Sequence, residues 1–411
     1  MKPAKAKYTM LYQICNLIPQ GLVPRLARKH GVDKKSRSFS AWSHVVAMIH
    51  GQLAHSISLN DIADTLRNQA GSLATIRRAK PPSRNGLSHA NIVRNANMAE
   101  ELFWETLKHI QQSHPKFGLG HKYSGLPRRF KRTIHAIDST TIQLVANCMD
   151  WAKHRRRKAA AKCHMQLNLQ TFLPSFAIVK AGNTHDSTEA KELCANLQDG
   201  EIALFDKAYV DFSHLWSLNQ RGVFWVTRAK DNMRYRIVGQ HRSPKGNIRQ
   251  DVLIELEVDK SREAYPEALR LVEADVEVNG KIKTMIFITN NMTWSSSSIC
   301  DLYKCRWGIE VFFKQIKQTL QLADFVGYSE NAVRWQVWMA MLAYLLLRYI
   351  SYLGEWTKSF RRLFTLLRGV LFNRLELYSV MECCGTARDG PRFVSAPGQA
   401  YLPGFEVFAK A

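Results

Sequence analysis

Apolar residues recur with two different periods along this chain, and the change of period separates two kinds of structure. Over the first 125 residues they recur every three or four positions, which is the period of an amphipathic helix. Ser58 and Asp61 have the spacing of a capping box, which indicates a helix start at that point. We expect helices over residues 39–53, 58–67 and 99–112, and a further helix that begins at Ser88.

Beyond a basic linker rich in Gly and Pro, residues 116–132, the pattern changes to short apolar runs typical of strands. Strands are expected over residues 133–145, 163–172, 176–180, 201–205 and 223–227, and helices over 187–197 and 212–221. Three strands, a helix and then alternating strands and helices is the order of a ribonuclease-H-like fold. The βαβ units imply a mixed sheet, flanked by helices, whose central strands are parallel.

A β-rich insertion, residues 229–291, precedes the next helix. Strands are expected over residues 251–258, 274–278 and 281–289, with a hairpin turn at Asn279-Gly280. After residue 320 the pattern is helical again to about residue 377, and the tail is expected to be irregular. The chain is therefore divided into a helical N-terminal domain (1–125), an α/β domain (126–350) and a C-terminal helical segment with an irregular tail (351–411).

Charge narrows the class of partner. Lys and Arg number 58 against 34 Asp and Glu, which gives a net charge of +24 and an isoelectric point near 9.8. Such an excess favours a polyanionic partner, nucleic acid first and an anionic membrane second. The membrane interpretation is the weaker one, because the most apolar run, 335–347, is too short to span a bilayer and is expected to be a buried helix.

Cysteine usage and the N-terminus indicate the compartment. The eight cysteines contain no Cys-x-x-Cys pair, so we expect reduced thiols in a cytosolic protein. The basic N-terminus is followed by no apolar segment, so no secretion signal is expected.

Three separated carboxylates are the candidate chemistry. Asp138 lies on a largely apolar strand, where an acid is costly unless a metal or cation neutralises it. Asp206 ends another strand, and the carboxyl ends of strands are where sites form in open α/β sheets. Glu310 lies on a helix. If the three converge, their hard oxygen ligands favour two Mg²⁺ ions, with Mn²⁺ as a substitute, which suits phosphodiester cleavage.

The helix that carries Glu310 has a polar face. Tyr303, Arg306, Glu310 and Lys317 are three, four and seven residues apart, so a single helix over 303–317 places them on one face. The other face is an apolar stripe made of Cys305, Ile309, Phe312, Phe313, Ile316 and Leu320. Beside a metal site, Arg306 and Lys317 are expected to contact backbone phosphates, and Tyr303 to donate a hydrogen bond to another.

Each of these interpretations has a structural alternative. An Asp at a strand end is more often a turn cap than a metal ligand, and Arg306 with Glu310 is also the spacing of a surface ion pair. The N-terminal helices suit DNA binding and dimerisation equally well.

Three further features have two interpretations each. The basic run with Arg155, Arg156 and Arg157 is expected to contact DNA, although such runs are usually solvated turns. His185-Asp186 suits a helix N-cap better than a metal or acid–base pair. Trp294 could stack on an unpaired base, with packing the favoured role.

These motifs resemble those of the bacterial DDE transposases of the insertion-sequence-4 family. The family signature Tyr-x2-Arg-x3-Glu-x6-Lys corresponds to Tyr303, Arg306, Glu310 and Lys317 with no change in spacing. The first-acid motif resembles Ile137-Asp138-Ser139-Thr140, and the second resembles Asp206-Lys207-Ala208-Tyr209, where the family has Gly or Ala at the third position. The resemblance covers about residues 130–350. Residues 1–75 resemble an N-terminal domain of undefined function found in one subgroup.

The resemblance implies a function. It implies a transposase that binds the terminal inverted repeats of an insertion sequence and uses Asp138, Asp206 and Glu310 for Mg²⁺-dependent cut-and-paste transposition. One strand is hydrolysed at each element end, a hairpin forms and is reopened, and the freed 3′-OH attacks target DNA. Two protomers are expected to hold two ends in a synaptic complex, in the bacterial cytoplasm, associated with the nucleoid and not with a membrane.

Two other functions remain open. A ribonuclease-H-like nuclease without strand transfer would share the three acids, although the insertion and the intact four-residue signature argue against it. An inactive or domesticated copy acting only as a DNA-binding protein would be expected to have lost an acid, and all three are present.

Overall fold

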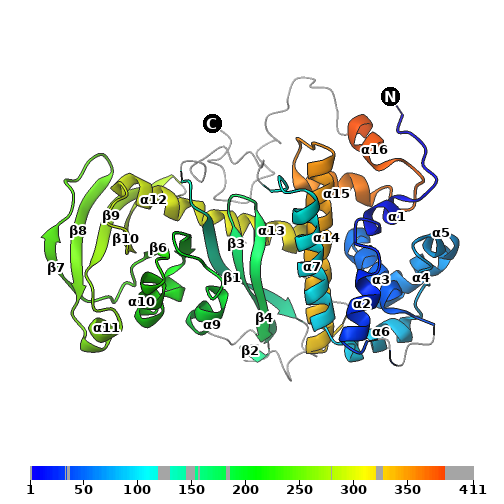
Figure 1. The fold of residues 1–411 in the computed structure, drawn as a ribbon, viewed down its shortest axis with the longest axis horizontal. Helices are drawn as coiled ribbons and strands as arrows, with labels where there is room; N and C mark the ends of the chain where they lie inside the picture. The colour runs from blue at the N-terminus through cyan, green and yellow to red at the C-terminus, as the bar shows by residue number, and fades with distance from the viewer. Residues whose placement is uncertain are drawn as a thin grey trace.

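The computed structural model describes residues 2–32, 34, 38–118, 130–144, 153–155, 158–181, 186–278, 280–320 and 327–384. Figure 1 shows a central sheet with the β-rich insertion on its left and the N-terminal helices on its right. No helix among these residues is long and apolar enough to cross a bilayer.

Short helices make up the N-terminal region, as the apolar period predicted. They are α1 (Met10–Cys15), α2 (Leu22–Lys29), α3 (Ala41–Ala54), α4 (Leu59–Asn68), α5 (Ala70–Thr75), α6 (Arg84–Val93) and α7 (Asn97–Ser113). The Ser58 hydroxyl accepts a hydrogen bond from the Asp61 amide at 3.1 Å, so the predicted cap of α4 is confirmed. The expected start at Ser88 is wrong, because Ser83 caps α6 and Ser88 lies inside it.

The strands form one mixed sheet. They are β1 (Ile134–Leu144), β2 (Lys153–Arg155), β3 (Lys158–Asn168), β4 (Leu173–Ala181), β5 (Ile202–Phe205), β6 (Phe224–Arg228), β7 (Tyr235–Gln240), β8 (Ile248–Leu256), β9 (Leu269–Val278) and β10 (Lys281–Thr289). Their order is β2-β3-β1-β5-β6-β10-β9-β8-β7, with β4 also paired to β3. The central strands β1, β5 and β6 are parallel and the other pairs are antiparallel, so the predicted mixed sheet is confirmed.

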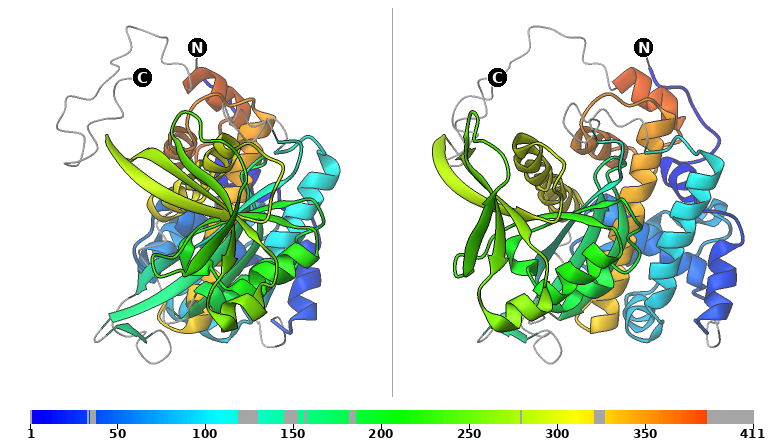
Figure 2. Two further views of the ribbon diagram at one scale, coloured as in Figure 1. Left: turned by 90° about the vertical axis from the view of Figure 1, so that its left-hand side faces the viewer. Right: turned by 60° about the vertical axis from the view of Figure 1, so that its left-hand side comes forward.

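Successive side chains of a strand point to opposite faces of the sheet. Both faces of this sheet carry apolar side chains, and helices cover both. On one face Ile137, Phe205 and Trp225 pack with α9 (Asp186–Leu193) and α10 (Phe212–Gln220). On the other face Ala136 and Leu204 belong to the core formed with α12 (Ser296–Cys305), α13 (Trp307–Thr319) and α14 (Glu330–Leu353). Figure 2 shows the twist of the sheet between these two layers.

The β-rich insertion extends this sheet. Its strand β10 pairs with β6, and β9, β8 and β7 follow outward. β7 and the short helix α11 (Asp259–Ala264) were not predicted from the sequence. The predicted hairpin is supported by the antiparallel register of Lys281 with Val278, although Asn279 itself lies outside the described residues.

The helix expected over 303–317 is two helices. α12 ends at Cys305 and α13 begins at Trp307, with Arg306 between them in a helical backbone conformation. The predicted apolar stripe is buried except for Cys305, which is half-buried. The helix also has a solvent-facing side, where Trp307 is 62% and Val311 38% exposed.

α14 joins the N-terminal helices to the rest of the chain. It is buried along most of its length, as expected for residues 335–347, and α3, α6 and α7 pack against it (Figure 1). The His44 ring lies 4.4 Å from the Trp335 ring, and the Trp335 indole donates to the Arg94 carbonyl at 2.7 Å. The C-terminal helices α15 (Phe360–Arg368) and α16 (Leu377–Cys384) complete the same core.

Candidate active site

Asp138 lies on the face of β1 that is covered by α13. Alternate residues of a strand point to the same face, so Asp138 shares a face with Ile134 and Ala136. The side chains of these two residues pack in the core of that face. Its carboxylate accepts a hydrogen bond from the Ser139 amide at 2.7 Å and is 19% exposed.

Asp206 is the first residue after β5, which runs parallel to β1. Ile137 pairs with Phe205 in that register, so Asp138 and Asp206 are the next residues along two adjacent strands. Asp206 also caps a 3₁₀ turn, Lys207–Tyr209, by accepting a hydrogen bond from the Ala208 amide at 3.2 Å. Asp206 thus has the turn-capping role that was the alternative to metal binding. Its second oxygen, Oδ2, remains available to the neighbouring site.

Arg306 brings the three acids together. Its two terminal nitrogens lie 2.8 Å from Asp138 Oδ2 and 2.7 Å from Glu310 Oε1. The nitrogen that contacts Glu310 is also 3.9 Å from Asp206 Oδ2. Asp206 and Glu310 are about one-third exposed, whereas the Arg306 side chain is only 10% exposed. Carboxylates from two strands and one helix therefore surround a single guanidinium.

The charges of this cluster do not cancel. One guanidinium against three carboxylates leaves two negative charges. Burial raises the pKa of Asp138 to about 6, partly offset by Arg306, and the like charges of Asp206 and Glu310 add to the rise. Burial alone would lower the pKa of Arg306, but the groups around it more than offset this and the pKa is raised. The cluster has the electrostatic character of a site that takes up further positive charge.

Tyr303 lies beside Arg306. Its ring packs 5.0 Å from the Phe287 ring, and the Arg306 guanidinium carbon lies 5.5 Å from the tyrosine ring centroid. Burial raises the pKa of the hydroxyl. Within the described part of the chain, neither the Tyr303 hydroxyl nor the Arg306 Nε has a hydrogen-bond partner. Two buried donors next to an acidic cluster are thus left without an acceptor.

Lys317 lies further along α13. Its ammonium donates to the Thr141 carbonyl of β1 at 2.6 Å, three residues beyond Asp138. The side chain is half-buried, which lowers its pKa. The structure therefore places Tyr303, Arg306 and Glu310 together, and Lys317 on the neighbouring stretch of β1.

The donor set suits a hard divalent cation, because three carboxylates from separate elements approach one positive group. Across the described residues, however, no three His, Cys, Asp or Glu side chains are arranged closely enough to hold a metal ion. The Arg306 guanidinium lies between the carboxylates and contacts them. A metal ion could bind among these carboxylates only if Arg306 moved.

The structure says less about the other residues singled out in the sequence. Arg155 lies on β2, while Arg156, Arg157 and His185 fall outside the described residues. The Trp294 ring packs 5.6 Å from Phe130 and 5.3 Å from Phe224, which agrees with the packing role. Six cysteines are free thiols: Cys15, Cys163, Cys194, Cys300, Cys305 and Cys383.

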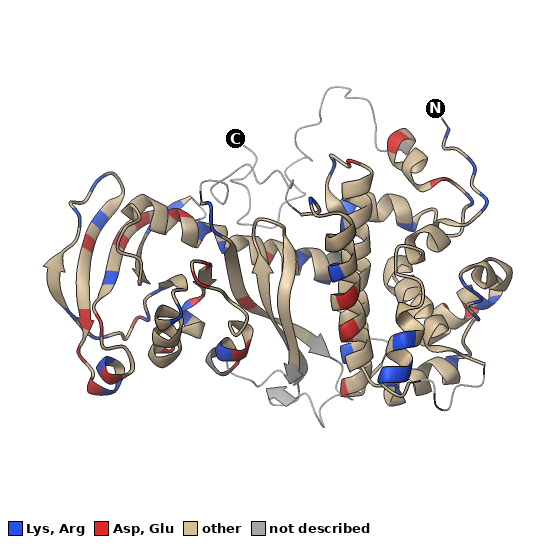
Figure 3. Ribbon diagram, in the orientation of Figure 1, with Lys and Arg blue, Asp and Glu red and all other residues tan. Residues whose placement is uncertain are grey.

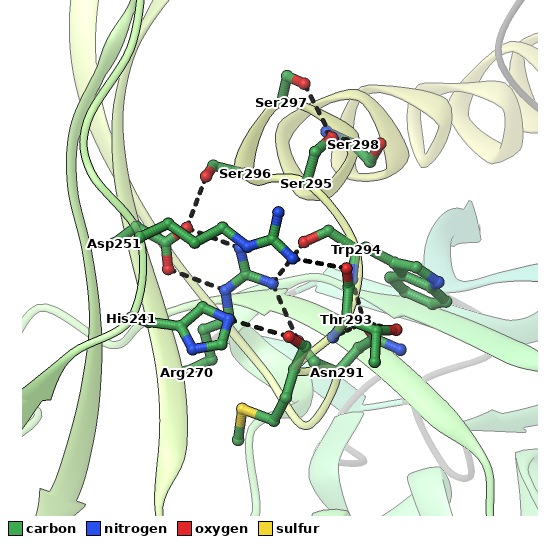
Figure 4. Close-up of polar contacts among 12 residues, drawn as sticks. His241, Asp251, Arg270, Asn291, Thr293, Trp294, Ser295, Ser296, Ser297 and Ser298 are labelled. Atoms are coloured by element: carbon green, nitrogen blue, oxygen red, sulfur yellow. Dashed lines mark hydrogen bonds and ion pairs between the residues drawn. The ribbon is translucent and has the colours of Figure 1, made fainter.

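Sequence reasoning missed one group of polar residues, shown in Figure 4. Asp251 and Arg270 form a fully buried ion pair inside the β-rich insertion. Arg270 stands between Leu269 and Leu271 on a strand, and a charge at an inward strand position is the feature that could have identified it.

Comparison with known proteins identifies the family. Residues 129–346, more than half of the chain, match the family described as "Transposase DDE domain". The chain belongs to the DDE transposase family. Residues 6–76 match a domain of unknown function (DUF4372), as the resemblance of the N-terminal region implied.

Two bacterial relatives carry transposase names. The protein y4zB of Sinorhizobium fredii, which carries a transposase name, is 30% identical over 62% of this chain and 70% of its own length. The transposase InsG for insertion sequence element IS4 of Escherichia coli is 27% identical over 45% of this chain and 42% of its own length. The chain thus spans between two fifths and seven tenths of these two relatives.

The fold was also compared with a solved structure of a transposase. The piggyBac transposase synaptic complex with hairpin DNA has a TM-score of 0.47 and 11% identity, over 96% of this chain and 86% of that chain. This likeness is too slight to support an argument about the site. Members of the DDE family generally use divalent metal ions and act on DNA.

Proposed function

We propose that this chain is the transposase of an insertion sequence and cuts and rejoins DNA at the Asp138, Asp206 and Glu310 carboxylates. The observation that carries the proposal is their convergence, within 4 Å, on the guanidinium of Arg306. The three acids come from β1, the end of β5 and α13, so the fold brings together residues that are far apart in sequence.

We infer that the fold is ribonuclease-H-like. The strand order β4-β3-β1-β5-β6, with β3 antiparallel to its neighbours and β1, β5 and β6 parallel, supports this assignment. In open α/β sheets, sites lie at the carboxyl ends of strands where the chain order reverses. Asp206 ends β5 beside β1, and the helical crossovers leave from that edge.

Asp138, Asp206 and Glu310 would hold Mg²⁺, or Mn²⁺ in its place, and two ions are proposed. When bound, such ions supply an activated nucleophile and stabilise the leaving oxygen of the phosphodiester. The residues of the chain position the DNA. The Tyr303 hydroxyl and the Arg306 Nε, both buried without acceptors among the described residues, are proposed to donate to a backbone phosphate. Lys317 is proposed to contact a phosphate further along the same strand.

The reaction is proposed to be cut-and-paste transposition. One strand is hydrolysed at each end, the 3′-OH attacks the opposite strand to form a hairpin, and the reopened end attacks target DNA. A homodimer is proposed to hold the two ends together. A location in the bacterial cytoplasm, associated with the nucleoid, fits this role.

DNA contacts are proposed to extend beyond the active site. The net charge of +24 favours a long phosphate-contacting surface. Figure 3 shows Lys and Arg along the whole ribbon, from the insertion to the N-terminal helices, rather than in one stripe. We propose that the N-terminal region (1–125) recognises the terminal inverted repeats, that the 126–350 domain carries the chemistry, and that Arg155, Arg156 and Arg157 contribute phosphate contacts.

Cleavage of a DNA fragment that ends in the element's own inverted repeats tests this function. Asp138→Ala and Glu310→Ala proteins should still bind the fragment in a mobility-shift assay but should not cut it in Mg²⁺. Glu255→Ala is the matched control, because Glu255 is an acid of the insertion that pairs with Arg236 on the surface. A Glu310→Ala protein that cut the fragment at the wild-type rate would refute the assignment. Cleavage without joining to target DNA would favour the nuclease alternative.

A further inference from the structure

The ion pair between Asp251 of β8 and Arg270 of β9 is completely buried. Both side chains are 0% exposed, and Arg270 contacts both carboxylate oxygens, at 2.8 Å through Nε and 2.6 Å through a terminal nitrogen. The Ser296 hydroxyl donates to the same carboxylate at 2.5 Å. Taking two charges fully out of water is costly, and apolar residues of similar volume often fill such a space with equal stability. Stability alone therefore does not explain why this buried pair is present.

The explanation lies in the loop that follows β10. Four consecutive carbonyls of this loop, residues 291–294, accept hydrogen bonds from side chains of the insertion (Figure 4). Arg270 donates to the first and last of them, Asn291 at 3.3 Å and Trp294 at 2.7 Å. His241 and Met292 O are 2.9 Å apart, and Arg242 donates to Thr293 at 2.8 Å. Each backbone group is thus fixed by a particular donor.

The same loop is also tied to the central sheet. The Asn290 side chain accepts from the Trp225 amide and donates to the Val223 carbonyl, both at 3.0 Å, beside β6. The Asn291 side chain accepts from the amides of Thr293 and Trp294, which closes the turn. The path of the loop is consequently set at one end by β6 and along its length by the insertion.

The loop leads directly into the helix that ends at the active site. Ser295 caps α12, and Ser296, its first residue, contacts Asp251. From Ser296 the helix runs ten residues to Cys305, a length of about 15 Å at the usual rise per residue, and Arg306 follows. A shift at the start of a rigid helix displaces its far end, and the next residue, Arg306, contacts Asp138 and Glu310.

We propose that Arg270, Asp251 and Arg242 are positioning residues, through which the β-rich insertion fixes α12 so that Arg306 and Glu310 face Asp138 and Asp206. This inference rests on the proposed function for its effect on rate, but its effect on the helix is independent of it. The insertion then has a role in the chemistry without touching the reacting atoms.

An Arg270→Lys protein tests the inference. Lysine keeps the positive charge beside Asp251 but cannot also donate to the carbonyls of Asn291 and Trp294, because it lacks the planar fork. The matched control is Arg236→Lys, an arginine of the same insertion that pairs with Glu255 on the surface at 2.6 Å. Three quantities are measured below the unfolding temperature of each protein. They are the affinity for end DNA, the single-turnover cleavage rate at saturating DNA, and amide hydrogen exchange over residues 291–310.

The expected result for Arg270→Lys is unchanged affinity, a cleavage rate lower by on the order of 100-fold, and faster exchange in α12. Arg236→Lys should match the wild type in all three. Should Arg270→Lys not fold, Arg242→Ala, which removes only the contact to Thr293 from an exposed position, should show the same pattern to a smaller degree.

Two results would overturn the inference. One is a folded Arg270→Lys protein that cuts at the wild-type rate. The other is a loss of affinity and rate in equal proportion with unchanged exchange in α12, which would make the pair purely structural. If the wild type cuts no end DNA, the proposed function fails, and the exchange measurement alone then decides whether the insertion positions α12.

Discussion

Two arginines of this molecule contact carboxylates at similar distances but in different ways. Arg270 faces one carboxylate, is fully buried, and uses its remaining donors on backbone carbonyls. Arg306 faces three carboxylates, is 10% exposed, and keeps its Nε without a partner among the described residues. The first cluster is neutral and complete, whereas the second retains two negative charges and an unused donor. Charge balance, rather than distance, separates a structural pair from a candidate site.

The difference has a physical basis. A buried pair whose charges cancel needs no further ligand, and breaking it leaves an isolated charge in an apolar interior. A cluster with excess negative charge that borders water attracts cations, and burial raises the pKa of an acid inside it. Asp138 has its pKa raised to about 6, while the pKa of Asp251 is lowered, because hydrogen bonds from Arg270 and Ser296 more than offset its burial.

Replacing Arg270 with alanine should have the largest effect on stability. It leaves Asp251 buried without a partner, which costs about 3–5 kcal/mol of unfolding free energy. Urea denaturation followed by circular dichroism measures this loss. Added Mn²⁺ should not restore the lost stability, because Asp251 is a single buried carboxylate and offers too few oxygen ligands for a metal ion. A stability equal to that of the wild type would show that the pair is not isolated from water.

Arg306→Gln should have a smaller and reversible effect. Without the guanidinium three carboxylates repel one another, and we expect a loss of about 1–2 kcal/mol, since water screens Asp206 and Glu310. Mn²⁺ should raise the melting temperature of Arg306→Gln more than that of the wild type, because the ion replaces the missing cation. An equal response of the two proteins would argue against a cation site at this cluster.

The pH dependence of metal binding should separate the two clusters as well. A raised pKa means that Asp138 takes up a proton as the pH falls through about 6, where an ordinary aspartate is still ionised. Mn²⁺ affinity should therefore fall below pH 6, approaching about tenfold per pH unit for one competing proton. Calorimetric titration at pH 7.5, 6.0 and 5.0 measures this. The lowered pKa of Asp251 keeps the buried pair ionised across the same range, so stability should not follow the same curve.

Arg236→Ala should have the smallest effect. Its pair with Glu255 lies on the surface of the insertion, where water and salt screen the attraction. The urea midpoint and the cleavage rate should both equal those of the wild type. A large loss of stability or of cleavage rate would mean that the exposed Arg236–Glu255 pair matters as much as the buried Arg270–Asp251 pair.

Much of the central sheet was predicted from the sequence, because the period of apolar residues is a local property. β1, β5 and β10 begin and end within a residue or so of their predicted bounds. Asp138 and Asp206 were predicted on two different strands, and the parallel register of β1 and β5 shows that these strands are adjacent. The family resemblance was based on motif spacing, and the match over residues 129–346 confirmed it.

Other features depend on contacts that no local pattern contains. β7 was missed because its apolar residues Ile237 and Val238 are consecutive and exposed, without alternation. The break at Arg306 was missed because its backbone conformation is helical, so the spacing of the polar residues is preserved. The contact between Arg270 and Asp251 joins residues 19 apart on two strands of the insertion, and only the register of β8 and β9 brings them together.

The central claim is that the unbalanced cluster at Arg306, and not the balanced pair at Arg270, is the metal-dependent centre. Anomalous scattering from crystals grown with Mn²⁺ and end DNA tests it most directly. The account predicts Mn²⁺ peaks within bonding distance of Asp138, Asp206 and Glu310, with the Arg306 guanidinium moved from these carboxylates toward a DNA phosphate. It would be contradicted by Mn²⁺ bound elsewhere on the protein while Arg306 still contacts all three acids.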